Sequence, residues 1–425
     1  MTINPDPQSL PTAAQIPLQN FHLPPFPTEA ANLKLLTLTS DIKPTDYADL
    51  LSTPLLQDAI PPTLPRGIES LTLELFSLGY PAPFLTRLGN ALPNLKDLTL
   101  YSHLIDGVSD SSRRDAGDFI HHVLTGSRNK DNSGGLRELH LLDLFCRKGF
   151  ISGIGDILHD LSSNGYDPKS QSALRFLEVS YTYRGHSDGE FLSRIPVDEL
   201  PKLLVGGLVA VSLRLEAITS ATTGASDTGL EGVPDDPADV DENGERVGRK
   251  PEGIVPVGSG DEGTKLLVEK LAGAGTGEEV ESVSESESES ESGLRMLDCT
   301  LYALSLEQLR RVLKRQRRLA VLSVSVLVSQ EDDAKRELLE ALKLGSEDLQ
   351  ALEVVGVPGS EWKDVADSVK SGDLFRDVFP SSSEMLDLAA ALPRLESFSM
   401  TILRAPAFGS VSWVNRDGKW VEGTA

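Results

Sequence analysis

The chain has 425 residues, 39% of them apolar, which is enough to bury a large core or to build an extended array of repeats. Its formal net charge of -24 argues against a general affinity for nucleic acid or for an anionic membrane surface. The two cysteines, Cys146 and Cys299, could form one disulfide, but they are too few for a disulfide framework or a cysteine-based structural zinc site.

The N-terminal segment, residues 1–27, contains seven prolines. Because each proline removes a backbone donor and fixes φ, we expect this segment to be extended and only partly ordered. It lacks the basic start and apolar stretch of a secretory signal, and no run in the chain reaches the roughly eighteen apolar residues that a membrane helix needs. We therefore expect a protein of the cytoplasm or nucleus with no membrane partner.

From residue 33 onward a short pattern, L-x-x-L-x-L, recurs and predicts short strands. The copies share an apolar residue at the first, fourth and sixth positions: Leu33/Leu36/Leu38, Ile68/Leu71/Leu73, Leu95/Leu98/Leu100, Leu136/Leu139/Leu141, Leu174/Leu177/Val179, Leu208/Val211/Leu213, Leu294/Leu297/Cys299, Leu319/Leu322/Val324, Leu349/Leu352/Val354 and Leu395/Phe398/Met400. By chance such a pattern occurs about once in thirty windows, so the pattern alone does not establish a repeat. The segments between the copies provide further evidence.

The segments between these copies can be helical. Leu92 and Leu392 each precede a proline, which predicts a helix end just before a strand. Ser305, with Gln308 three residues later, has the signature of a capping box. A strand and a helix every few tens of residues predict an α/β fold, in which short parallel strands and helices stack into a solenoid of irregular repeat length.

This pattern resembles the leucine-rich-repeat proteins of the ribonuclease-inhibitor-like type, and especially the degenerate repeats of fungal F-box proteins, over roughly residues 30–405. The resemblance implies a substrate-recognition subunit of a cullin-type ubiquitin ligase. The sequence departs from the family in two ways. Strand starts are 25 to 46 residues apart, and the asparagine or cysteine that usually closes the repeat motif is absent. No F-box pattern is found among the residues that precede Leu33.

An acidic segment interrupts the array. Between Glu216 and Gly293 there are 20 acidic and 5 basic residues, which account for -15 of the net charge. We expect residues 217–293 to be a disordered insert, because they have too few apolar residues to offset the entropy of ordering. Four serines near its end have a glutamate three residues later, a context that favours phosphorylation: Ser282, Ser284, Ser286 and Ser288. The alternative is an unmodified solvating linker.

The insert divides the repeats into a first part, residues 28–216, and a second part, residues 294–405. The last segment, residues 406–425, differs from both. A glycine-containing turn at residues 415–418 lies between two short segments with the composition of strands, residues 410–414 and 419–421, which predicts a β-hairpin. We expect this hairpin to cap the open end of the array, with Trp413 and Trp420 covering its core.

Local signals for an enzyme are weak. Residues 258–265 have the G-x-G-x-x-G spacing of a phosphate-binding loop, but Asp261 and Glu262 would repel a phosphate, so a linker is the favoured interpretation. His121 and His122 are adjacent and cannot share a metal from one helix face. The common hydrolase and metalloprotease motifs are absent. We expect no enzyme activity, cofactor or metal, with a non-local active site on an irregular α/β scaffold as the alternative.

One basic cluster stands out: Arg310, Arg311, Lys314, Arg315, Arg317 and Arg318. It is interpreted as a solvated helix face, with a nuclear-import signal, an anchor for an acidic partner, or a contact with the acidic insert as alternatives. The sequence as a whole predicts a protein–protein interaction scaffold with its partner on the repeat surface, and neither nucleic acid nor a small-molecule substrate is expected. A nuclear acidic scaffold that binds basic proteins through the insert is a second hypothesis.

Overall fold

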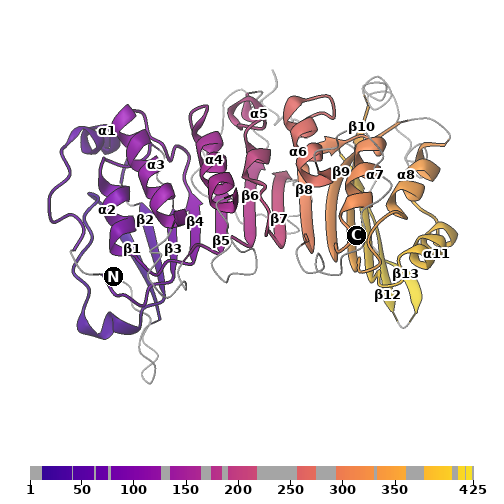
Figure 1. Cartoon of the computed structure of the whole chain (residues 1–425), viewed down its shortest axis with the longest axis horizontal. Helices are drawn as coiled ribbons and strands as arrows, with labels where there is room; N and C mark the ends of the chain where they lie inside the picture. The colour runs from indigo at the N-terminus through magenta and orange to yellow at the C-terminus, as the bar shows by residue number, and fades with distance from the viewer. Residues whose placement is uncertain are drawn as a thin grey trace, which may run out of the picture.

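Among the described residues, thirteen strands form one open sheet in the order of the sequence, and ten of them contain the last two residues of a predicted triplet (Figure 1). The computed structural model describes residues 12–40, 42–61, 64–74, 78–125, 135–163, 174–183, 190–217, 256–273, 293–329, 333–359, 378–403, 410–416 and 418–423. The strands are β1 (Ala13–Leu18), β2 (Leu35–Ser40), β3 (Ser70–Glu74), β4 (Asp97–Tyr101), β5 (Glu138–Leu142), β6 (Phe176–Tyr183), β7 (Ala210–Ala217), β8 (Met296–Leu304), β9 (Val321–Val328), β10 (Ala351–Pro358), β11 (Ser397–Ile402), β12 (Ser410–Arg416) and β13 (Lys419–Gly423).

Neighbouring strands from β1 to β11 pair in parallel, and only the pairs β11–β12 and β12–β13 are antiparallel. The chain is therefore an α/β protein with a mostly parallel sheet, and this part of the predicted fold class is confirmed. All ten predicted strands are present. The sheet does not close into a barrel, because β1 and β13 are at opposite ends of the strand order.

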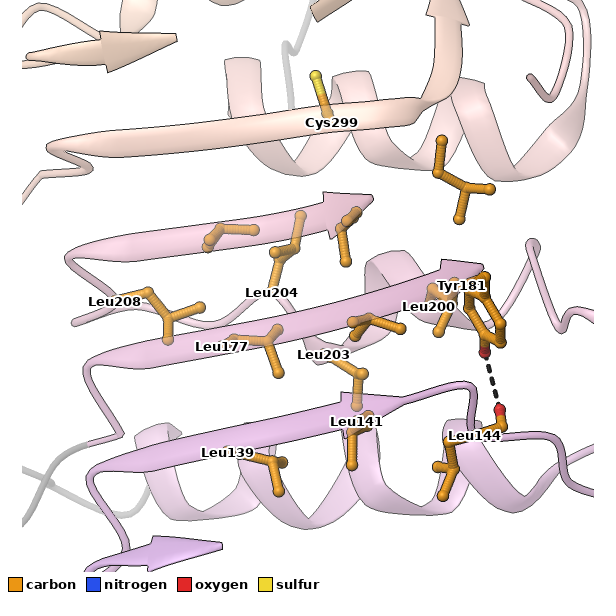
Figure 2. Close-up of a cluster of buried hydrophobic side chains, with 14 of the residues drawn as sticks. Leu139, Leu141, Leu144, Leu177, Tyr181, Leu200, Leu203, Leu204, Leu208 and Cys299 are labelled. Atoms are coloured by element: carbon orange, nitrogen blue, oxygen red, sulfur yellow. Dashed lines mark hydrogen bonds between the residues drawn. The ribbon is translucent and has the colours of Figure 1, made fainter. Parts of the chain in front are cut away.

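The last two apolar residues of each triplet form the core on one side of the sheet. Alternate residues of a strand face opposite sides, so residues paired in register face the same side. Leu36, Leu71 and Leu98 are paired in this way on three successive strands, and each is at most 1% exposed. Figure 2 shows the same row further along the sheet, where Leu139 and Leu177 point to one side from neighbouring strands.

Helices cover this core. In the described residues they are α1 (Pro44–Ser52), α2 (Phe84–Ala91), α3 (Asp110–Thr125), α4 (Phe150–Ser163), α5 (Phe191–Arg194), α6 (Glu262–Ala272), α7 (Leu306–Arg315), α8 (Ala334–Leu342) and α11 (Ser382–Ala391), with the 3-10 helices η1 (Thr28–Asn32) and η2 (Leu200–Leu203). From α2 onward they contact one another nearly in chain order, so they form one layer along the sheet (Figure 1). The predicted capping box of Ser305 and Gln308 begins α7.

Carboxylates from one segment cap the helix of the segment before it. Asp115 in α3 accepts hydrogen bonds from the backbone nitrogens of Leu85 and Thr86, at 2.9 and 3.0 Å, at the start of α2. Glu199 accepts in the same way from Gly149 and Ser152, at 2.6 and 2.9 Å, at the start of α4. The first turn of a helix has backbone donors without partners inside the helix, so each carboxylate also fixes the spacing of two neighbouring segments.

Two predicted boundaries need correction. The segment 1–27 was expected to precede the array, but β1 lies within it and forms the first strand of the sheet, with Ile16 and Leu18 in the core. Pro17 is tolerated there because β1 is an edge strand, where a missing backbone donor breaks no ladder bond on the outer side.

Residues 256–273 were expected to belong to a disordered insert, and this prediction is wrong for them. Val257 forms a parallel bridge with Tyr302, and α6 packs between η2 and α7. Leu267, Val268 and Leu271 bury one side of α6. A Cβ added to Gly263 would lie 2.3 Å from the carbonyl oxygen of Val197, so a larger residue does not fit at this position. A helix is therefore present inside the acidic segment and completes the helix layer.

The C-terminal hairpin is confirmed. β12 adds to β11 and pairs with β13, and the Asn415 side chain accepts a hydrogen bond from the Gly418 backbone nitrogen at 2.9 Å. Gly418 has φ +81°, a conformation that favours glycine. Trp413 is 4% exposed and lies in the core, and Trp420 packs against it at half burial. The hairpin thus covers the end of the core, as expected.

Candidate interaction surface

The strand residues between the buried leucines face the other side of the sheet, which we call the open face. The described helices follow one another along the opposite, leucine-lined side (Figure 1). Leu35 illustrates the difference, because it is 48% exposed while its neighbour Leu36 is 1% exposed. The two sides of the sheet therefore differ in their role: one holds the fold together, and the other is available for contacts with another molecule.

A continuous row of polar side chains runs across the open face. We call it the central row; its members are joined strand by strand in the pairing register and are Gln15, Thr37, Thr72, Thr99, His140, Glu178, Ser212, Asp298, Ser323, Glu353, Ser399 and Ser412. Every position in it is polar. Polar alternation on one face of a sheet is what water or a polar partner requires. Ser212, Asp298 and Ser323 are at most 9% exposed, and the other members are half-buried or exposed.

Charged groups concentrate where the row crosses β4 to β6. His140 Nδ1 lies 2.6 Å from a carboxylate oxygen of Glu178, and His140 Nε2 lies 3.6 Å from Glu138. The imidazole also contacts the Phe176 ring, with 5.0 Å between the ring centres. Asp97 is on the neighbouring strand, in register with Glu138. The result is a histidine held among three carboxylates on an accessible surface.

These contacts change the proton affinity of the groups involved. The hydrogen bond with Glu178 raises the pKa of His140, and the same bond lowers the pKa of Glu178. Burial and then the negative charge of Glu138 raise the pKa of Asp97. Further along the row, burial raises the pKa of Asp298, whose carboxylate accepts from the Thr300 backbone nitrogen at 3.1 Å. The carboxylates of the open face therefore differ in proton affinity: the pKa of Glu178 is lowered, whereas those of Asp97 and Asp298 are raised.

The charged pair of His140 and Glu178 is expected to stabilise the chain only within a pH window. The pKa of His140 is raised from 6.5 in the folded chain. The stabilisation that the charged pair contributes is therefore complete below pH 6.5 and is lost as pH rises through the pKa of His140 in the folded chain. Because the pKa of Glu178 is lowered from 4.5, the contribution is also lost as pH falls through its folded value. Glu178→Gln should therefore lower the pKa of His140, as followed by NMR titration of its ring protons.

A matched substitution supplies the control for this titration. Glu353→Gln removes a carboxylate from the same row, four strands from Glu178 and without a contact to His140, and should leave the His140 pKa where it is. An unchanged His140 pKa in the Glu178→Gln variant would contradict the arrangement described.

The predicted basic cluster lies on the helix side. Arg311, Lys314, Arg315 and Arg317 are exposed, whereas Val312 and Leu313 are buried under α7. Arg310 lies 3.8 Å from Glu337 of α8, and Arg318 is half-buried. Arg310, Arg311, Lys314 and Arg315 thus belong to α7 and lie on its outer side, whereas Arg317 and Arg318 follow its end. The sheet separates the cluster from the open face. The four serines proposed for phosphorylation lie outside the described residues.

The loop with glycine spacing begins α6 and does not form a phosphate cradle. Asp261 caps the helix by accepting from the Gly263 backbone nitrogen at 2.8 Å, and Thr264 donates to the Gly258 carbonyl at 2.8 Å. The carboxylate therefore occupies the place that a phosphate would need.

The described residues contain no group of three or more histidine, cysteine or acidic side chains arranged to hold a metal ion. Cys146 and Cys299 are free thiols, and burial raises the pKa of Cys146 to about 12. In the described part of the chain, no helix has both the length and the apolar composition needed to cross a membrane.

Sequence reasoning missed the open-face residues. His140 and Glu178 are 38 residues apart and become neighbours only through the register of β5 and β6. Each open-face residue of the central row on β2 to β11 is the fifth residue of an L-x-x-L-x-L copy, between the second and third apolar positions. Comparison with known proteins adds no family: no protein-family model and no curated protein sequence matches the chain.

Proposed function

We propose that the chain is a protein-binding scaffold of the leucine-rich-repeat-like solenoid type, and that the open face is its binding surface. The observation that carries the proposal is the central row, which is polar at every position from β1 to β12. A strand and a helix layer repeated along one axis support the solenoid interpretation. Extended surfaces of this kind suit contacts with proteins better than the enclosure of a small substrate.

The ligase role is the more specific part of the proposal. The resemblance to the repeats of fungal F-box proteins suggests that the bound partner is a substrate delivered to a ubiquitin ligase. In that case the chain acts together with cullin-adaptor subunits. The open face would select the substrate, and a separate part of the assembly would contact the adaptor.

The proposal is tested by blocking the open face without changing its charge. Ser399→Trp places a large side chain in the central row on β11, whereas Ser382→Trp places the same side chain at the exposed start of α11. Affinity purification with mass spectrometry should recover the same partner with the unmodified chain and with Ser382→Trp, but not with Ser399→Trp. Equal recovery with both variants would contradict the proposed surface, and cullin-adaptor subunits among the partners would support the ligase role.

A further inference from the structure

On five successive strands, β6 to β10, the central row carries an acidic residue on every second strand. Glu178 is on β6, Asp298 on β8 and Glu353 on β10, and the strands between them carry Ser212 and Ser323. Strands in a sheet are roughly 4.8 Å apart, so successive carboxylates start from positions about 10 Å apart. This spacing is a property of the register and cannot be read from any single motif.

An apolar strip runs beside these carboxylates. The open-face residues two positions before the central row share an apolar side chain and half-burial on all five strands: Phe176, Ala210, Met296, Val321 and Ala351. Half-buried apolar side chains in a line offer contact area to the stem of a long side chain. This second feature is independent of the charge, and it follows the same line across the sheet.

The three carboxylates have few cations of their own. Glu178 is bonded to His140, and Glu353 accepts from the Ser323 hydroxyl at 3.0 Å. The nearest cation to Asp298 is Arg214, with 4.0 Å between Nε and Oδ2. Among the described residues, no lysine lies within ion-pair distance of any of the three. This part of the central row therefore carries negative charge that can attract cations from another molecule.

We propose that the open face of β6 to β10 binds an extended peptide segment that has a lysine or arginine at about every third residue. The inference rests on the proposed function and names the partner class for that surface. The segment has the polyproline II conformation, in which three residues span about 9 Å and every third side chain points to the same side, close to the spacing of the carboxylates. The charged ends of the lysine or arginine side chains contact Glu178 and Glu353, and their aliphatic stems lie on the apolar strip. Asp298 is 7% exposed, so it acts on a cation above it through its charge.

The probe for this proposal is a fluorescein-labelled peptide with lysine at every third position and alanine or serine between, titrated with the whole chain and followed by fluorescence anisotropy. A second peptide of the same composition has its lysines in one block. The spaced peptide should bind several-fold more tightly than the block peptide. Equal affinity for the two peptides would overturn the proposal, because it would show attraction by net charge alone.

Charge-matched variants locate the site. Glu178→Gln, Asp298→Asn and Glu353→Gln should each weaken binding of the spaced peptide by roughly 3- to 5-fold, and together by more than about tenfold. Three substitutions on the helix side, Glu307→Gln, Glu337→Gln and Glu340→Gln, remove the same charge from α7 and α8 and should leave the affinity within about twofold. Similar losses in the two triple variants would overturn the proposal.

Two arginines on the same sheet allow a test of the sign of the partner's charge. Arg175 and Arg295 are exposed and lie one position before the apolar strip, on the edge where β6 and β8 begin. Replacing both with glutamine should tighten binding of the spaced peptide, because two repelling charges are removed. Weaker binding in this variant would contradict a basic partner. Glu353 is exposed, so Glu353→Gln remains informative even if the Asp298 variant folds poorly.

The outcomes separate this inference from the proposed function. If Ser399→Trp abolishes capture of the natural partner while the acidic triple variant does not, the open face remains the binding surface and the basic-peptide inference fails. If neither variant affects capture, the proposed function itself fails. Loss of capture in the acidic triple variant, with full capture by the helix-side triple variant, supports both.

Discussion

Replacing Leu36 with alanine is expected to lower the free energy of unfolding by about 2–5 kcal/mol, because the residue lies in the core row of the sheet and leaves a cavity there. Replacing the adjacent Leu35 should change it by less than about 0.5 kcal/mol, because this side chain lies on the open face. The two residues are 1% and 48% exposed and belong to the same strand, β2. Urea denaturation of both variants, followed by circular dichroism, makes the comparison.

The comparison of Leu35 and Leu36 also tests the register of the whole sheet. A shift of one residue exchanges the two faces of a strand, so it would reverse the order of the two effects. Equal losses of stability would contradict a sheet with one buried and one accessible side. The pair is well matched because the same side chain, the same strand and the same substitution are compared.

Replacing Asp106 with alanine is expected to destabilise the chain by about 3 kcal/mol, at the lower end of the range for breaking a buried ion pair. Its side chain is fully buried, and one carboxylate oxygen lies 3.1 Å from Arg147 Nε. The carboxylate also accepts from the Arg147 backbone nitrogen, at 3.1 and 3.2 Å. Without the Asp106 carboxylate this donor loses its partner, and the guanidinium, which is 32% exposed, keeps its hydrogen bonds to the backbone carbonyls of residues 106 and 109 and its contact with Asp110.

Asp110 supplies the control for Asp106. It also approaches Arg147, at 3.5 Å from Nη1, but its side chain is 94% exposed. Water and salt screen such a contact, so Asp110→Ala should cost less than about 1 kcal/mol. Thermal unfolding of both variants at the same pH separates the two cases. A loss of similar size in both would show that burial does not determine the strength of the Asp106 interaction.

The strands could be predicted from the sequence because each leucine triplet records both burial and alternation. For example, β11 was predicted from the triplet Leu395, Phe398 and Met400, although only its first member is leucine. β1 was missed because the proline count of its surroundings outweighed the alternation of Ala14, Ile16 and Leu18. A proline argues against a central strand, and only the position of β1 at the edge removes that objection.

The acidic segment shows a different limit of sequence reasoning. Averaged over its whole length, its composition predicts disorder. Yet Thr264, Leu267, Val268 and Leu271 have the i, i+3, i+4, i+7 spacing of a buried helix side, and all four are buried in α6. A compositional average hides a short amphipathic helix whose partners, η2 and α7, lie on both sides of it in the fold.

The open face could not be predicted from the sequence, because its rows arise only when strands far apart in the chain are aligned. A polar residue between two leucines looks the same whether it faces bulk water or forms part of a patterned surface. The register joins Glu178 and Asp298 through Ser212, across the long segment between β7 and β8. The same register brings His140 to Glu178 at 2.6 Å.

Site-specific photo-crosslinking tests the central claim, that the open face is the surface that binds a protein partner, most directly. A photoreactive residue is placed at Thr99 or Ser399 in the central row, or at Arg311 or Glu340 on the exposed side of α7 and α8. We expect covalent products with the natural partner from Thr99 and Ser399 and none from Arg311 or Glu340. Crosslinks from the helix positions, with none from the central row, would contradict the proposed function.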